Sequence, residues 1–259
     1  MRQILPTLLT SILLLGCDPH VDSPYLGREE ARLLADVSAG NLAAVKKFLD
    51  QGGNVNLQDE PGMTPLHHAV NADWKGSHLK MIKLLIDRGA DVTAIDDTHH
   101  TPLHLASNKE AAQLLIDAGA DVNAKTELTG ETLLNSAAWG AAQGGPKSYE
   151  NYLDLTKLLI SKGADVNVKL RSGSMIQDDE PYRDKSRDTI LHQVARSYSE
   201  QHASEVCELL IANGAKVNEF NVKGQTPLDE ALANGRKKTA EFLRKYDAKT
   251  SEELKAEGK

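Results

Sequence analysis

Apolar residues separated by three and four positions recur along most of the chain, and this spacing predicts a series of amphipathic helices. Two examples are residues 81–86, which read Met-Ile-Lys-Leu-Leu-Ile, and residues 206–211, which read Val-Cys-Glu-Leu-Leu-Ile. The first stretch is followed by Gly89, a residue that can take the left-handed conformation in which helices often end. The pattern predicts many short helices, each with its apolar side packed against its neighbours.

Two short strings recur in a fixed order along this pattern. The string Thr-Pro-Leu-His, or a variant of it, occurs at 64–67, 101–104, 132–135, 189–192 and 226–229. The string Gly-Ala-Asp-Val followed by Asn or Thr, or a variant of it, occurs at 52–56, 89–93, 119–123, 163–167 and 214–218. Thr is a favourable helix N-cap, Pro suits the first helical position, and the fourth residue can bond back to the cap. Each first string therefore predicts the start of a helix.

These two strings closely resemble the ankyrin repeat over residues 29–247. The resemblance implies an all-α ankyrin-repeat solenoid of about six helix-turn-helix units, with long fingers and insertions between them. One helix pair cannot bury its own apolar face, so stacking must supply the core. We expect the first unit, about 29–56, and the last, about 224–247, to be terminal caps. Residues 248–259 then form a charged C-terminal tail.

Insertions distinguish this chain from a regular array. Relative to the usual spacing, the second unit is longer around 72–78, the fourth between its helices at 139–149, and the fifth near Tyr198. The third unit loses its inter-helix turn at 107–109, and the finger before the fifth is extended over 169–187. Insertions in repeat proteins fall in loops on one face, often the binding face. Neutral drift in exposed loops is the alternative.

The N-terminal segment carries a targeting pattern. Arg2 precedes an apolar run over 4–15, which is too short to cross a bilayer as a helix and has the length of a signal-peptide core. The run ends in Leu-Leu-Gly-Cys, which resembles the lipobox of bacterial lipoproteins. That resemblance implies a signal peptide at 1–16, a lipidated Cys17 with a tether at 17–28, and a membrane anchor in the bacterial envelope. An ordinary cleaved secretion signal and a spurious Leu-rich start are the alternatives.

Composition narrows the classes of partner. The net charge of −7 argues against a nucleic-acid partner, because such binding needs clustered Lys and Arg. It mildly favours a basic protein partner. There are two cysteines, so lipidation of Cys17 would leave Cys207 without a disulfide partner. Cys207 takes an apolar helical position, which predicts a buried thiol rather than a redox sensor.

The sequence gives little support for a metal site, a cofactor or catalysis. There are nine histidines, but His67 and His104 stand at equivalent positions of successive units, too far apart to share one zinc ion. An Asp-Asp-Glu cluster at 178–180 has no calcium-loop spacing and is expected to be a solvated loop. No hydrolase, phosphate-loop or metalloprotease motif is present in the sequence. We expect no cofactor, no metal and no enzyme activity.

The candidate binding residues come from the ends of the first helices and the finger tips. Trp74 and Trp139 are the two tryptophans, each expected just past a first helix, where repeat arrays line their groove; burial between helices is the alternative. Aromatic residues and Arg favour interfaces. Carried over from the family position by position, the partner-binding candidates are Trp74, Trp139, Asn71, Gln58, Glu60, Met63, Asp97, His100, Glu127, Glu131, Arg196, Tyr198, Val222 and Gln225.

Together these features predict a non-catalytic protein-binding module anchored to the bacterial envelope, which displays its groove to another protein. Two alternatives concern the partner. The chain could be an immunity lipoprotein that neutralises a secreted antibacterial toxin, or a periplasmic stress-protection factor that supports an envelope enzyme such as a catalase. An enzyme within the insertions is a third. Fold alone does not decide among them.

Overall fold

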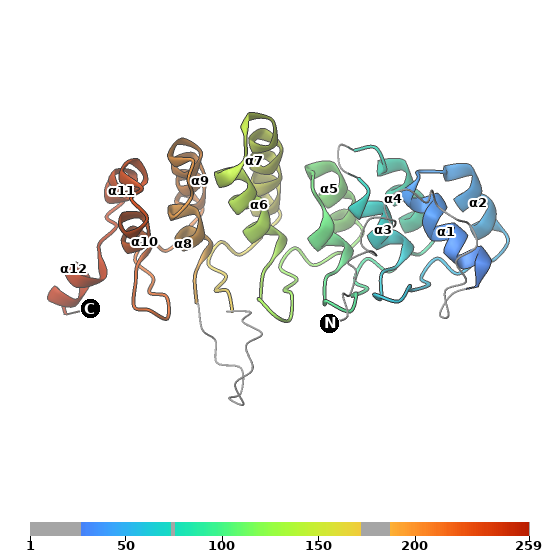
Figure 1. The fold of residues 1–259 in the computed structure, drawn as a ribbon, viewed down its shortest axis with the longest axis horizontal. Helices are drawn as coiled ribbons and strands as arrows, with labels where there is room; N and C mark the ends of the chain where they lie inside the picture. The colour runs from blue at the N-terminus through green and yellow to red at the C-terminus, as the bar shows by residue number, and fades with distance from the viewer. Residues whose placement is uncertain (1–26, 74–75, 172–186, 259) are drawn as a thin grey trace, which may run out of the picture.

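Pairs of short helices stand side by side in a row, from α1 and α2 at one end to α10 and α11 at the other (Figure 1). This computed structural model describes residues 27–73, 76–171 and 187–258. Across these residues the only strand-like pairing is an isolated bridge between Lys169 and Thr189. The predicted all-α solenoid is confirmed.

The helices form two layers. The first helices of successive units are α1 (Arg28–Ser38), α3 (Pro65–Asn71), the 3-10 helix η1 (Pro102–Leu105), α6 (Leu133–Gln143), α8 (Ile190–Ala195) and α10 (Pro227–Ala233). The second helices are α2 (Leu42–Asp50), α4 (Leu79–Asp87), α5 (Lys109–Asp117), α7 (Pro146–Ser161), α9 (Glu200–Ala212) and α11 (Lys237–Arg244). Each first helix contacts the next first helix, and each second helix the next second helix. The core is therefore continuous along the row.

Leucines of the recurring string form the centre of that core. The third residue of each copy is at most 2% exposed, as seen at Leu66, Leu103, Leu134, Leu191 and Leu228. Burying one such side chain contributes about 1.5–3 kcal/mol. Cys207 also lies in the core with no exposed surface, and burial raises its pKa to about 12. The prediction of a buried thiol is confirmed.

The string also caps its helix as predicted. The backbone N–H of Thr64 donates to Nδ1 of His67 at 3.1 Å, and the same contact recurs between Thr189 and His192 at 3.1 Å. Because Nδ1 accepts, the neutral ring carries its proton on Nε2. That Nε2 reaches a carbonyl of the next finger, from His67 to His100 and from His192 to Gln225, each at 3.1 Å. The histidine therefore links consecutive units as well as capping a helix.

Asparagines of the second string provide another link. The side-chain amide of Asn123 donates to the Gly163 carbonyl at 3.2 Å, and its oxygen accepts the Asp165 N–H at 2.8 Å. The same pair of bonds joins three further asparagines to the equivalent turn of the following unit, at Asn56, Asn167 and Asn218. Thr93 takes this position in the second unit, where its backbone N–H and its hydroxyl both donate to Oδ1 of Asp91, at 2.8 and 2.7 Å, within its own turn.

The fourth unit differs from its predicted form. Its insertion lengthens both helices instead of forming a loop, because α6 runs on to Gln143 and α7 begins at Pro146. Trp139 consequently lies within α6, and the expectation that it follows the end of a first helix is wrong. The physical reason is a set of small apolar residues at helical spacing that pack with no exposed surface, namely Ala137, Ala138, Ala141 and Ala142.

The C-terminal end also differs from expectation. Asp247 takes the place of the turn glycine with a φ of 59°, a conformation that Asp tolerates better than most residues. The helix α12 (Ser251–Ala256) follows within the predicted tail, capped by a reciprocal pair of bonds between Thr250 and Glu253. Its Leu254 is 5% exposed. A short helix therefore follows the sixth unit within the segment expected to be a charged tail. In the part of the chain that the structure describes, no helix could span a membrane.

Candidate protein-interaction surface

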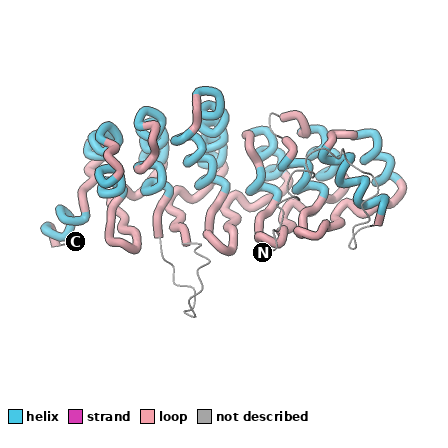
Figure 2. The backbone as a smooth tube through the Cα atoms, viewed as in Figure 1, coloured by secondary structure: helices cyan, strands magenta, loops and turns pink. Residues whose placement is uncertain are grey.

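The fingers between units project from one edge of the array (Figure 2). Five predicted finger residues are exposed, namely Gln58, Glu60, Asp97, Glu127 and Val222. Four others are half-buried, namely Met63, His100, Glu131 and Gln225. Asn71 is exposed at the last position of α3. Trp74 and Cys17 lie outside the described residues, so the structure does not test their predicted roles.

The first two fingers are tied together. The side-chain amide of Gln58 donates to the Gly62 carbonyl at 3.1 Å, and the Asp97 N–H donates to the Pro61 carbonyl at 3.0 Å. Gly62 has a φ of +75°, and a Cβ there would lie 2.8 Å from Oδ1 of Asp97. Glycine is required at this close approach. Gln58 and Asp97 thus hold the finger edge in shape as well as lining it.

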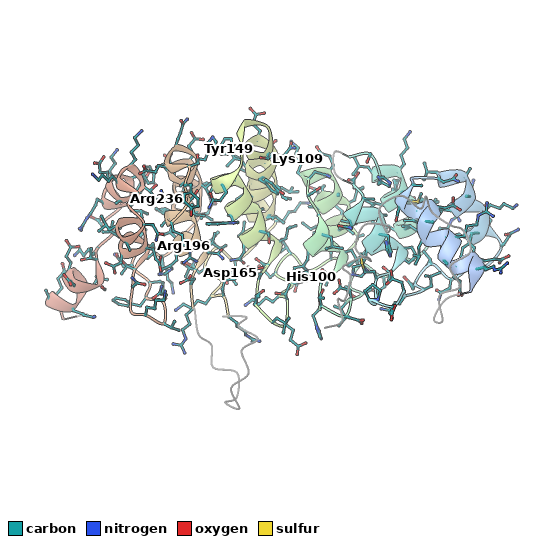
Figure 3. All side chains as sticks on the ribbon, viewed as in Figure 1. His100, Lys109, Tyr149, Asp165, Arg196 and Arg236 are labelled. Atoms are coloured by element: carbon teal, nitrogen blue, oxygen red, sulfur yellow. The ribbon has the colours of Figure 1, made fainter. Side chains whose placement is uncertain are left out.

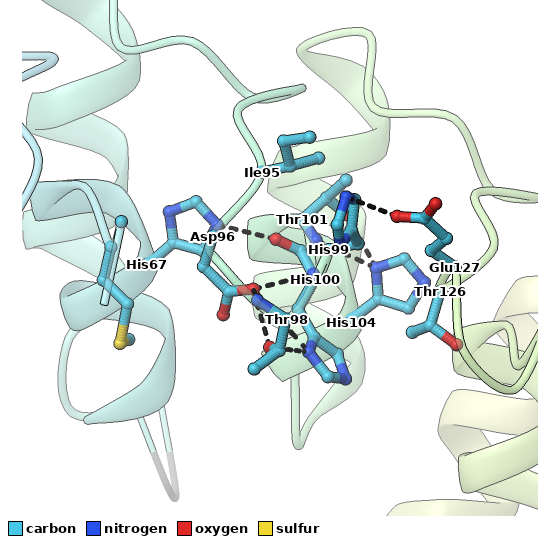
Figure 4. Close-up of polar contacts among 12 residues, drawn as sticks. His67, Ile95, Asp96, Thr98, His99, His100, Thr101, His104, Thr126 and Glu127 are labelled. Atoms are coloured by element: carbon cyan, nitrogen blue, oxygen red, sulfur yellow. Dashed lines mark hydrogen bonds and ion pairs between the residues drawn. The ribbon is translucent and has the colours of Figure 1, made fainter. Parts of the chain in front are cut away.

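The second and third fingers are joined by a contact of 2.5 Å between Nε2 of His99 and a carboxylate oxygen of Glu127 (Figure 4). Asp96 organises the finger from within, since its Oδ1 accepts the N–H groups of Thr98 and His100, both at 2.9 Å. Burial opposes ionisation of Asp96, but these hydrogen bonds prevail and its pKa lies below the ordinary value. The finger edge is therefore a pre-shaped surface with fixed charges.

Three predicted residues meet at one hollow between the fourth and fifth units. The hollow has a volume of about 320 Å³ and is lined by Glu131, Asn135, Ser136, Trp139, Gln193 and Arg196. Trp139 is 36% exposed. These residues come from three separate segments. Glu131 lies on a finger, Trp139 on α6, and Arg196 at the end of α8.

A buried polar network holds Arg196. Its guanidinium pairs with Asp188 at 2.7 Å and with Glu230 at 3.6 Å. The side-chain amide of Asn221 donates to both of these carboxylates, at 3.0 and 3.3 Å. Asp188, Asn221 and Glu230 are each less than 9% exposed. Two buried carboxylates, themselves held by Asn221, therefore fix the orientation of the Arg196 guanidinium.

Tyr198 extends this surface toward the sixth unit. Its side chain is 79% exposed, and the Arg236 guanidinium lies 4.4 Å from its ring centre. Figure 3 shows Arg196 and Arg236 on neighbouring units of the row. We call Trp139, Arg196, Tyr198 and Arg236 the aromatic–arginine cluster. An exposed Trp and Tyr flanked by Arg is the composition found at interface hot spots.

Sequence reasoning missed Arg236 and the three residues that hold Arg196. They come from three stretches of chain, around 188, 221 and 230–236, and no pattern within one repeat marks them. The side chains around the hollow and Tyr198 provide hydrogen-bonding groups, charges and aromatic surface, and these are groups with which a protein binds another molecule. Within residues 27–73, 76–171 and 187–258, no group of three or more His, Cys, Asp or Glu side chains could hold a metal ion.

Comparisons with known proteins agree on the family. A family model described as ankyrin repeats in three copies matches residues 33–126 and 139–253. Among curated proteins, mouse ankyrin repeat and SOCS box protein 16 is 35% identical over 188 residues, covering 73% of this chain and 37% of that protein. Human neurogenic locus notch homolog protein 1 is 30% identical over 164 residues, covering 63% of this chain and 6% of that protein. The chain thus spans little more than a third of the length of the first relative and 6% of the length of the second.

Two solved bacterial structures are similar. An ankyrin repeat domain from Acinetobacter baumannii AYE has a TM-score of 0.67 at 23% identity, covering 85% of this chain and 100% of that one. A chain in the structure of a predatory endopeptidase from Bdellovibrio bacteriovorus in complex with an immunity protein has a TM-score of 0.56 at 30% identity. It covers 82% of this chain and 96% of that one. Stacked helix pairs, capping strings and the matched model lead to one conclusion: this chain belongs to the ankyrin repeat family.

Proposed function

We propose that this ankyrin repeat protein is a non-catalytic binding module, anchored to the bacterial envelope, which recognises a protein partner with its aromatic–arginine cluster and finger edge. The observation that carries the proposal is the cluster itself. An exposed Tyr198 under Arg236, beside a half-exposed Trp139 and an Arg196 held by buried carboxylates, contributes nothing evident to the core.

The mechanism is rigid display. Binding costs free energy when side chains and loops must be ordered. Here Arg196 is fixed by Asp188 and Glu230, and the fingers are tied by contacts such as His99 with Glu127. Since these groups are ordered before the partner arrives, less free energy is lost on association. The net charge of −7 favours a partner with a basic face.

A binding assay with surface variants tests the proposal. Envelope proteins are cross-linked to the array in cells, and captured proteins are compared between wild type and the double variant Trp139→Ala with Tyr198→Ala. We expect at least about a tenfold loss of the specific partner, as expected for hot-spot residues. Lys83→Ala, at an exposed position of α4 in the second-helix layer, is the matched control. Equal capture by the double variant and wild type would overturn the assignment of the cluster.

Envelope anchoring rests on Cys17 and the apolar run before it. Two or more acyl chains anchor a protein stably, whereas one gives only marginal binding. We expect Cys17→Ala to leave the detergent phase on phase partitioning, while wild type stays in it. A processed Cys17→Ala product that still partitions with detergent would contradict lipidation.

A more specific function, neutralisation of a toxin or hydrolase, is favoured by one observation. The 30% identical neighbour belongs to the structure of an endopeptidase in complex with an immunity protein. In this version, the acidic array occludes the active cleft of an enzyme. Purified array is added to a candidate hydrolase whose gene lies beside this one, and its activity is measured. Inhibition that disappears in the Trp139→Ala and Tyr198→Ala double variant supports the immunity role, and undiminished hydrolysis at saturating array excludes that enzyme.

A further inference from the structure

Arg236 stands just before the second helix of the sixth unit and links this unit to the one before it. It is the N-cap residue of α11, and its Nε–H donates to the Arg196 carbonyl at 3.3 Å. His78, the N-cap residue of α4, makes the equivalent link, since its Nε2 lies 3.0 Å from the Ser38 carbonyl. Both carbonyls lie at the end of the first helix of the preceding unit. At this position, one side-chain nitrogen is enough to join two units.

An arginine has more capacity than this link uses. His78 engages both ring nitrogens, because its Nδ1 also lies 2.9 Å from the Ser77 hydroxyl. A guanidinium carries five N–H donors, and the link of Arg236 takes only the one on Nε. In the part of the chain that the structure describes, its two terminal amino groups make no hydrogen bond. The link between units therefore explains the Nε of Arg236 but not the rest of its guanidinium.

Tyr198 holds this guanidinium at a second point. The central guanidinium carbon lies over the ring, 4.4 Å from the ring centre. Tyr198 is itself 79% exposed, so the contact buries neither group in the core. With its Nε bonded and its carbon over the ring, Arg236 is ordered before a partner arrives. Less free energy is then lost when a partner binds to it.

The two arginines of the aromatic–arginine cluster differ in the balance of their charge. Arg196 is paired with two buried carboxylates, those of Asp188 and Glu230. Arg236 makes no ion pair within residues 27–73, 76–171 and 187–258. The charge of Arg196 is therefore compensated inside the protein, whereas the charge of Arg236 is available to another molecule.

The residues after Arg236 do not compensate its charge. Lys237 and Lys238 are exposed, and they too have no ion pair among the described residues. The carboxylate of Glu200 contacts this corner, but it accepts the backbone N–H of Lys238 at 2.5 Å and bonds no side-chain cation there. The whole chain has a net charge of −7. The sixth unit thus presents cations at the edge of the cluster, although the molecule as a whole is acidic.

We propose that Arg236 is the charged anchor of the interaction surface and receives the carboxylate of an aspartate or glutamate of the partner protein. The inference rests on the proposed function. The two oxygens of a carboxylate accept from the two terminal amino groups in parallel, and this geometry adds specificity as well as energy. The ring of Tyr198 covers one side of the ion pair. A basic face of the same partner can still meet the acidic parts of the array.

One substitution separates the anchor from the link. Arg236→His keeps a nitrogen for the Arg196 carbonyl, as His78 does, but removes the terminal amino groups. Peptides are selected from a random library on the wild-type full-length protein, and their affinities are measured at pH 8, where histidine is neutral. We expect an invariant Asp or Glu, and at least tenfold weaker binding to Arg236→His at an unchanged melting temperature. Arg32→Gln, at an exposed position of α1, is the control.

An exchange of charges tests the pairing directly. Arg236→Glu should bind the peptide more weakly still, and lysine in place of the acidic residue of the peptide should restore at least tenfold of the loss. Selected peptides that share no acidic residue, or that bind Arg236→His as tightly as wild type, would overturn the anchor. If such peptides still need Trp139 and Tyr198, the proposed function stands. Peptides that need Arg236 but bind the Trp139→Ala and Tyr198→Ala double variant normally would support the anchor and count against that function.

Discussion

At the scale of single residues, the capping histidines combine two roles in one ring. Each accepts from its own threonine through Nδ1 and reaches the next finger through Nε2. Burial lowers the pKa of His67, His104 and His192. Most of the hydrogen bonds of these rings require the neutral form. Protonation would place a proton on Nδ1, where the threonine N–H already donates.

This arrangement predicts acid sensitivity. In the unfolded chain these rings take up protons near the ordinary value of 6.5, whereas the folded array resists protonation. The stability that the neutral rings contribute to the folded state is fully present above about pH 6.5. It is lost as the pH falls through the lowered pKa values of the folded protein. We expect the melting temperature to fall between pH 7 and pH 5. His192→Asn, which keeps the cap as Asn135 does, should flatten part of this dependence; an unchanged slope would contradict it.

Cys207 provides a second prediction at this scale. Since burial raises its pKa to about 12 and its side chain has no exposed surface, the folded thiol should not react with a disulfide reagent at pH 8. Full reaction is expected only after denaturation, measured in protein carrying Cys17→Ala so that one thiol is counted. Rapid labelling of the folded form would show that α9 opens locally.

At the scale of elements, the recurrence of asparagine after the Gly-Ala-Asp-Val string was visible in the sequence, but its partners were not. The amide reaches a carbonyl about one unit further along, as from Asn167 to Gly214 at 3.0 Å. The lengths of the helices in unit four could not be predicted from the repeat pattern either. Unit four departs from the family spacing at 139–149, and only packing of its alanines shows that this stretch extends α6 and not a loop.

Three substitutions test the asparagine link. Asn167→Ala removes two hydrogen bonds, to Gly214 and from Lys216, and each contributes about 0.5–1.5 kcal/mol. We expect the free energy of unfolding, measured by chemical denaturation, to fall by about 1–3 kcal/mol, and to fall less for Asn213→Ala, whose amide donates to Leu209 of its own helix. Thr93→Asn should gain stability by completing the missing link. A loss of stability in Thr93→Asn would show that the joint between the second and third units has no room for the asparagine amide.

At the scale of the whole molecule, the architecture was predictable because the same local signals recur in order, and each supports the others. The candidate surface was predictable only in part. Glu131, Trp139 and Arg196 were identified and do meet, but the buried network under Arg196 joins residues from separate units. Such a network depends on how units stack, and one-dimensional patterns do not contain that information.

The end of the array gives a prediction at this scale. Because stability in a solenoid is a sum of units and interfaces, loss of α12 should expose the last unit to water. We expect Leu254→Ala, at a 5% exposed position, to cost about 2–3 kcal/mol and to raise hydrogen exchange first in α10 and α11. Glu252→Ala, at an exposed position in the same helix, is the control. Uniform exchange along the whole row would argue for a single cooperative unit.

At the joint between the fourth and fifth units, Asn135 stands where the other strings have the linking histidine, and this has a mechanical consequence. The neighbouring joints, from unit three to four and from five to six, carry both the histidine and the asparagine links, but this joint keeps only that of Asn167. Contacts made by the lengthened helices cross this joint instead, since the Ser197 hydroxyl donates to the Ala142 carbonyl at 2.7 Å and the Tyr149 ring stacks on His202. This joint therefore depends on side chains found in the fourth and fifth units alone, so an exchange of either unit for a regular repeat would uncouple the two halves of the row even though every recurring string were kept.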